Sequence, residues 1–86
     1  MILISTHLIL QKIDLQDIDL SPLRTCVALG WTNLKANALH NIDLAPLSFC
    51  VNLKEIELTD NPLQSVDLSH LPTGVRVKYG DYVRIT

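Results

Sequence analysis

Two cysteines and three aspartates recur at one fixed spacing along the chain. Cys26 and Cys50 are 24 residues apart. Asp19, Asp43 and Asp67 follow one another at the same interval. Two thiols can form a disulfide, and a group of carboxylates can bind calcium. Whether they do so depends on the elements that carry them, and the common spacing indicates that those elements repeat.

The segments around these residues are copies of one another. Residues 18–26 read IDLSPLRTC, residues 42–50 read IDLAPLSFC, and residues 66–74 form a looser third copy, VDLSHLPTG. The shift is 24 residues both times, without an insertion, which indicates a stack of equivalent structural units. Four leucine columns align at this shift: Leu10, Leu34 and Leu58; Leu15, Leu39 and Leu63; Leu20, Leu44 and Leu68; Leu23, Leu47 and Leu71.

Each unit combines a strand pattern with a short helical pattern. Residues 56–58 alternate apolar and polar side chains, as a half-buried strand does. A turn rich in Asn, Asp and Pro follows at residues 59–62. In the return segment, Ser21 supplies a hydroxyl cap and Pro22 suits the first helical position. Only about one helical turn fits before the next strand, so we expect a short helix or a 3₁₀ segment.

Residues 53–63 carry the most regular unit, with the pattern L-x-x-I-x-L-x-x-N-x-L. Residues 29–39 match it with Thr32 at one apolar position, and the first unit has Ile13 where the asparagine belongs. The pattern resembles the leucine-rich repeat over nearly the whole chain, from about residue 3 to residue 71. The resemblance implies an α/β fold, a right-handed leucine-rich-repeat solenoid. Its parallel β-sheet would form the concave face and its short helical or 3₁₀ segments the convex face.

One domain over residues 1–86 is expected, because 86 residues can enclose only a small core. Its charged, β-prone end is expected to cap one edge of the sheet. At the other end, Ile2, Ile4 and Ile9 are apolar, and we expect an edge without comparable cover. The repeat units and the C-terminal cap are expected at about 3–26, 27–50, 51–74 and 75–86.

Four residues are predicted to be structural. The amides of Asn37 and Asn61 can satisfy both N–H and C=O groups of buried turns. Cys26 and Cys50 would lie about 4.8 Å apart in neighbouring units, which makes a disulfide geometrically possible. Side chains in such a column run parallel, however, so we favour two buried free thiols.

The histidines do not predict a metal site. His7, His40 and His70 fall at three different positions within the repeat, so they cannot readily converge on one ion. For the aspartate column, hydrogen bonds from nearby backbone amides are favoured over a cation site. No arrangement of Ser, His and Asp indicates a nucleophile. The sequence therefore predicts no metal, no cofactor and no enzymatic activity.

The outward strand positions form the candidate binding surface. Residues 8, 10, 32, 34, 56 and 58 are expected to face inward, so their neighbours face outward. The outward columns are His7, Trp31, Glu55 and Tyr79; Ile9, Asn33, Glu57 and Asp81; and Gln11, Lys35 and Thr59. An outward tryptophan among charged residues is typical of a binding hot spot. The alternatives are that Trp31 packs over the strand surface or that a register slip turns it inward. The predicted binding residues are His7, Trp31, Asn33, Lys35, Glu55, Glu57 and Tyr79.

Composition narrows the function classes. With 48% hydrophobic and 5% aromatic residues, the apolar content is mostly aliphatic and argues against disorder. A net charge of −2 with 19% charged residues argues against nucleic acid as a partner. No apolar run reaches the ~20 residues of a membrane helix. The first residues lack the features of a secretory signal, and the two cysteines then suggest a reducing, cytoplasmic location.

The leading expectation is a non-enzymatic protein–protein interaction module that binds its partner on the concave sheet face. The resemblance supplies this class, and the strand columns supply the residues. Two alternatives stay open. The chain could be a structural protein that self-associates into a homo-oligomer through the open N-terminal edge. It could also be a regulatory or targeting piece of a larger protein.

Overall fold

Short strands and two 3₁₀ helices make up the regular structure. The computed structural model describes residues 2–4 and 6–86, and side chains from residue 6 onward. In chain order the elements are β1 (Ile2–Ile4), β2 (His7–Ile9), η1 (Ser21–Thr25), β3 (Trp31–Asn33), η2 (Ala45–Phe49), β4 (Glu55–Glu57), β5 (Ser65–Val66), β6 (Arg76–Lys78) and β7 (Arg84–Ile85).

The main sheet is open and mostly parallel. Its order is β1-β2-β3-β4-β6, and only the β1–β2 pair is antiparallel. His7 pairs with Trp31, and Trp31 pairs with Glu55, so adjacent strands keep the 24-residue shift of the sequence. The predicted parallel sheet is therefore confirmed. A second, two-stranded parallel sheet joins β5 to β7.

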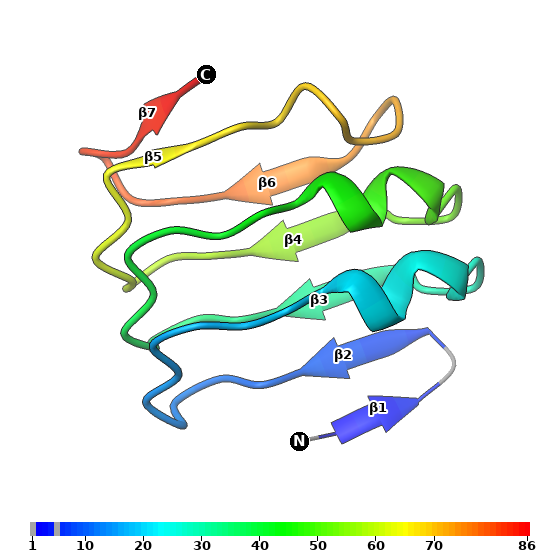
Figure 1. Cartoon of the computed structure of the whole chain (residues 1–86), viewed down its shortest axis with the longest axis horizontal. Coiled ribbons are helices and arrows are strands. Elements are labelled where there is room, and N and C mark those ends of the chain that lie inside the picture. Colours follow the sequence, from blue (N-terminus) through cyan, green and yellow to red (C-terminus); the bar gives the residue numbers. More distant parts are fainter. Residues whose placement is uncertain (1, 5) are drawn as a thin grey trace.

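The apolar core lies between the sheet and the return segments. Figure 1 shows η1 and η2 side by side in front of the sheet, and the molecule is 18 Å deep along this view. The strand residues predicted to face inward are all buried. Every leucine column contributes to the core. The fully buried side chains of the core include Leu29, Leu34, Leu39, Leu47 and Ile56.

The return segments are 3₁₀ helices, as expected, but the predicted hydroxyl cap at Ser21 is wrong. Ser21 is the first residue of η1, and the cap position is Leu20, which makes no side-chain cap bond. The carboxylate of Asp19 instead accepts the Ser21 N–H at 2.9 Å. The predicted cap fails because the 3₁₀ helix begins one residue earlier than a cap at Ser21 requires, and the Leu23 N–H already donates to the Leu20 carbonyl oxygen at 2.9 Å.

Equivalent aspartates do the same in the other units. Asp43 accepts the N–H of Ala45 at 3.0 Å, and Asp67 accepts the N–H of Ser69 at 2.9 Å. Asp67 also accepts the Ser69 hydroxyl at 2.6 Å, and this bond, followed by the backbone bond, lowers its pKa. The local role predicted for the aspartate column is confirmed.

The Asn37 side chain connects the turn of the first repeat unit to the turn of the second by hydrogen bonds. Its Oδ1 accepts the N–H groups of Ile13 and Leu15, both at 3.1 Å. Its Nδ2 donates to the carbonyl oxygens of Leu10 at 2.8 Å and Leu34 at 3.0 Å. Asn61 bonds in the same way between the second and third units. The role predicted for both asparagines is confirmed.

The N-terminal edge of the main sheet is open, as predicted, but it is formed by β1, a strand outside the repeat. β1 pairs along β2, with Leu3 opposite Leu8, so β2 is not a bare edge. Only two residues separate β1 from β2, which is too few for the crossover that a parallel pair needs, and the 24-residue pattern could not show this. Ile9 is half-buried, whereas the side chains of Ile2 and Ile4 lie outside the described residues.

The C-terminal segment contributes to both sheets. β6 extends the main sheet beside β4, and β7 pairs with β5. The return from Val66 to Arg76 is three residues shorter than the one from Ile42 to Glu55. Glu55 therefore pairs with Arg76, and the extension of the 24-residue shift to Tyr79 is wrong.

The two cysteines are free thiols in different surroundings. Cys50 is fully buried, and its Sγ lies 3.5 Å from the Leu23 carbonyl oxygen, to which it donates a hydrogen bond. Burial raises the pKa of the Cys50 thiol, with a smaller contribution from Cys26. Cys26 is only half-buried, so the expectation of two buried thiols holds for Cys50 alone.

Thr32 gives a prediction about stability. It occupies an inward position at 2% exposure, and its Oγ1 finds no hydrogen-bond partner in the described chain. Burying such a hydroxyl costs free energy, so Thr32→Val should raise the free energy of unfolding by about 1 kcal/mol. Thr59→Val is the control, because the Thr59 hydroxyl donates to Glu57 at 2.6 Å. Urea denaturation measures the free energy of unfolding of both variants. An equal increase in the two would contradict the cost assigned to the unpaired Thr32 hydroxyl.

Candidate binding surface

The outward face of the main sheet carries two rows of side chains that cross four strands. The first row is defined as His7, Trp31, Glu55 and Arg76. The second row is defined as Ile9, Asn33, Glu57 and Lys78. In each of these strands the residue between the two rows points to the core, so both rows lie on the opposite face.

Backbone hydrogen bonds fix the start of each strand in the first row. The carbonyl oxygen of Thr6 accepts the N–H groups of Gly30 at 2.8 Å and Trp31 at 3.0 Å. The carbonyl oxygen of Gly30 then accepts the N–H groups of Lys54 at 2.7 Å and Glu55 at 3.2 Å. The first-row side chains are therefore set in register by the sheet itself.

Trp31 is held by an aromatic stack. The rings of His7 and Trp31 are 4.6 Å apart between centroids and inclined by 12°. The Nδ1 of His7 lies 2.8 Å from the Thr6 hydroxyl oxygen, within hydrogen-bond distance. Because the ring separation matches the strand spacing, His7 covers the indole face toward β2, and Glu55 is the neighbour of Trp31 on β4. Trp31 remains 38% exposed.

The two glutamates are paired with cations from β6. Glu55 Oε1 lies 3.8 Å from Arg76 Nη1 and 3.6 Å from Lys78 Nζ. Glu57 Oε2 lies 3.9 Å from the same Lys78 Nζ. Glu57 Oε1 also accepts the backbone N–H of Thr59 at 3.2 Å and its hydroxyl at 2.6 Å. Both carboxylates are thus engaged by groups of this chain.

Asn33 links the polar residues beside the second row. Its Nδ2 donates to Gln11 Oε1 at 2.8 Å, and its Oδ1 accepts the N–H of Lys35 at 3.1 Å. The amide is therefore oriented before any partner arrives.

Two shallow hollows adjoin the indole. One, of about 200 Å³, lies over β2–β4 and is lined by His7, Leu8, Ile9, Trp31, Thr32, Asn33, Glu55 and Glu57. The other, of about 420 Å³, lies toward β6 and is lined by Trp31, Leu53, Lys54, Glu55, Thr73, Gly74 and Arg76. Trp31 and Glu55 line both hollows, so the indole lies between them.

Most of the predicted binding residues share this face. The structure brings together His7, Trp31, Asn33, Glu55 and Glu57 around one hollow. Lys35 lies two residues beyond the end of β3, and its backbone N–H donates to Asn33 Oδ1. Tyr79 follows β6 and is not in the first row.

Arg76 and Lys78 were missed by the sequence reasoning. The signal that could have found them is Val77, the apolar residue between them. Val77 pairs with Ile56, so aligning apolar residues rather than keeping the 24-residue shift gives the observed register.

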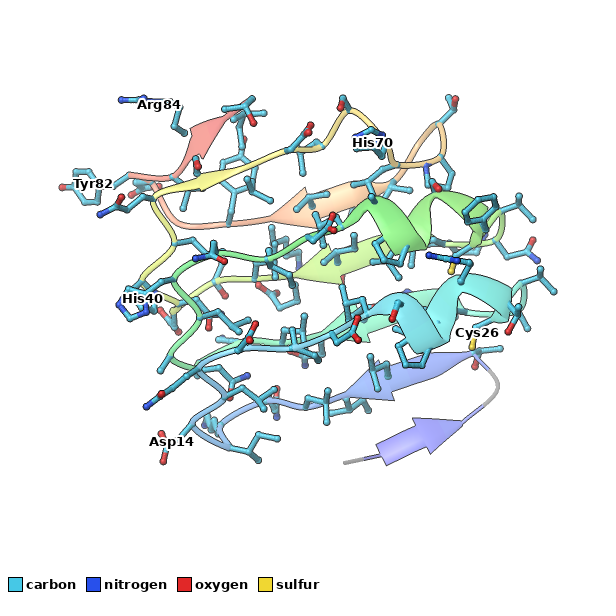
Figure 2. All side chains as sticks on the ribbon, viewed as in Figure 1. Asp14, Cys26, His40, His70, Tyr82 and Arg84 are labelled. Atoms are coloured by element: carbon cyan, nitrogen blue, oxygen red, sulfur yellow. The ribbon has the colours of Figure 1, made fainter. Side chains whose placement is uncertain are left out.

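The other two histidines lie apart from each other. Figure 2 shows His40 at the left edge of the molecule and His70 near its upper edge. Among the described residues, no three His, Cys, Asp or Glu side chains are grouped closely enough to hold a metal ion. A search of the same residues for a helix with the length and apolarity of a membrane span finds none.

Comparison of the chain with protein-family models, with curated proteins and with solved structures finds no match.

Proposed function

We propose that the chain is a short leucine-rich-repeat solenoid that binds another protein through the sheet face formed by the first and second rows. The leucine and asparagine spacing supports the solenoid, together with the 24-residue register of three neighbouring strands. The proposed module is non-enzymatic, and its partner lies across the parallel sheet.

One observation carries the binding proposal. A tryptophan, 38% exposed and pre-oriented by its stack on His7, lies between two hollows on a face rimmed by charges. Fixed aromatic side chains lose little conformational entropy on binding, which is one reason why interfaces are rich in them. A cytoplasmic location fits the two free thiols, because a reducing compartment keeps them reduced.

Self-association is the weaker alternative. Its support is the open N-terminal edge, and β1 forms that edge as the outermost strand of the main sheet. β1 is only three residues long, which offers few backbone groups for pairing with a second copy. The charged side chains of β6 at the other edge disfavour pairing of two sheets edge to edge.

Trp31→Ala tests the proposal. Affinity capture from an extract of the cells that express the protein should retain partners on the wild type and lose most of them on Trp31→Ala, by about tenfold or more. The circular dichroism spectrum should stay nearly unchanged, because the indole lies on the outward face. Quantitative mass spectrometry of the captured proteins gives the measurement.

Tyr82→Ala is the matched control, since Tyr82 is 98% exposed and outside both rows. It should capture the same proteins as the wild type. Equal capture by all three proteins would contradict the proposal, and unfolding of Trp31→Ala would show that the indole is part of the core.

A further inference from the structure

Exposure separates the cations from the carboxylates on the binding face. The side chains of Arg76 and Lys78 are 75% and 48% exposed. Those of Glu55 and Glu57 are only 27% and 17% exposed. A partner that approaches the sheet therefore meets the basic groups first, with the acidic groups beneath them.

Both carboxylates already have partners within this chain, whereas Arg76 and Lys78 keep N–H donors that are free to bind another molecule. Glu57 accepts two hydrogen bonds from Thr59, and Glu55 lies near two cations. The ion pairs are long, at 3.6–3.9 Å, and their cations are largely in water, so each contributes little to stability. They orient Arg76 and Lys78 without using up the donors of either.

The larger hollow adds a third cation. Lys54 is exposed and lines it together with Arg76, the indole of Trp31 and the backbone around Gly74. A Cβ at Gly74 would meet nothing within 4 Å, so this side of the hollow is open. Lys54, Arg76 and Lys78 outnumber the two glutamates, and the local balance is positive in a chain of net charge −2.

We infer that the partner presents an acidic segment to this face, an inference that rests on the proposed function. Its carboxylates pair with Arg76, Lys78 and Lys54, and an apolar or aromatic neighbour packs on the exposed part of the Trp31 indole. A guanidinium can hold a carboxylate by two parallel hydrogen bonds, which gives Arg76 the leading role. The charge complementarity sets partner choice and the rate of association.

Selection from a phage-displayed random peptide library tests this inference. Peptides retained by the wild type and by Tyr82→Ala, but not by Trp31→Ala, should be enriched in Asp and Glu. The most enriched peptide, made synthetically with a fluorophore, is then titrated by fluorescence anisotropy. Its Kd should rise about tenfold or more for Arg76→Glu and by less for Arg76→Gln, which removes the charge without reversing it.

Arg84→Glu is the control for the change in net charge. Arg84 belongs to β7 in the second sheet, and Figure 2 places it at the outer corner of the molecule. Its substitution should leave the Kd within about twofold of the wild type, because exposed charges this far from the rows are screened by salt.

The outcomes separate the inference from the proposed function. Trp31-dependent peptides without acidic enrichment, or a Kd equally changed by Arg76→Glu and Arg84→Glu, would overturn the acidic partner and leave the binding face in place. If no selected peptide depends on Trp31, both the inference and the proposed function fail.

Discussion

Replacing Asn37 by alanine is expected to lower the free energy of unfolding by about 3 kcal/mol. The side chain satisfies four backbone groups of two neighbouring turns, and it is only 9% exposed. Alanine leaves those groups without partners, and each such buried group costs about 1–3 kcal/mol, reduced where water can enter. Total stability of an 86-residue domain is about 4–13 kcal/mol, so this loss is large. Urea denaturation followed by circular dichroism measures it.

Asn52→Ala is the matched control. The Asn52 amide donates one hydrogen bond at an exposed position, to the carbonyl oxygen of Val27 at 2.8 Å. Its removal should cost about 1 kcal/mol or less, because water can replace the lost partner. Equal losses for Asn37→Ala and Asn52→Ala would contradict the role given to the buried amide.

Leu47→Ala should lower the free energy of unfolding by about 3 kcal/mol. Leu47 belongs to η2 and is fully buried between the 3₁₀ layer and the sheet. Truncation loses the transfer free energy of the removed methyl groups and leaves a cavity that the stacked units cannot close. The thermal midpoint should fall by more than about 10 °C, which calorimetry measures.

Phe49→Ala provides the comparison within the same helix. Phe49 is 57% exposed, so its loss should cost less than about 1 kcal/mol although the side chain is larger. If Phe49→Ala were the more destabilising of the two, the core would not lie where η2 faces the sheet.

The sheet and its core could be predicted because the repeat encodes them directly. The alternation at Ile56, Glu57 and Leu58 fixes which side chains face inward, and the 24-residue shift fixes which residues are neighbours. Asn37 could be predicted because an amide is one of few side chains that both donate to and accept from a buried backbone.

Features at the two ends could not be predicted in the same way. β1 pairs antiparallel with β2, and the return from β5 to β6 is three residues shorter than the one before β4, so neither feature follows from the repeat. The proposed binding face was therefore only partly predictable: His7 and Trp31 were correctly predicted to be neighbours, but Tyr79 was predicted beside Glu55 where the structure has Arg76. The stack of His7 on Trp31 depends on side-chain rotamers, which the strand spacing does not determine.

The central claim, that equivalent units stack strand beside strand, is tested most directly by NMR couplings across hydrogen bonds. The structure has the N–H of Leu10 bonded to the carbonyl oxygen of Asn33, and that of Leu34 to Glu57, both at 2.9 Å. A long-range HNCO experiment should therefore show correlations from Leu10 to Asn33 and from Leu34 to Glu57. Correlations of Leu10 and Leu34 with residues a few positions away, as in hairpins or helices, would contradict the stacked units and with them the proposed binding face.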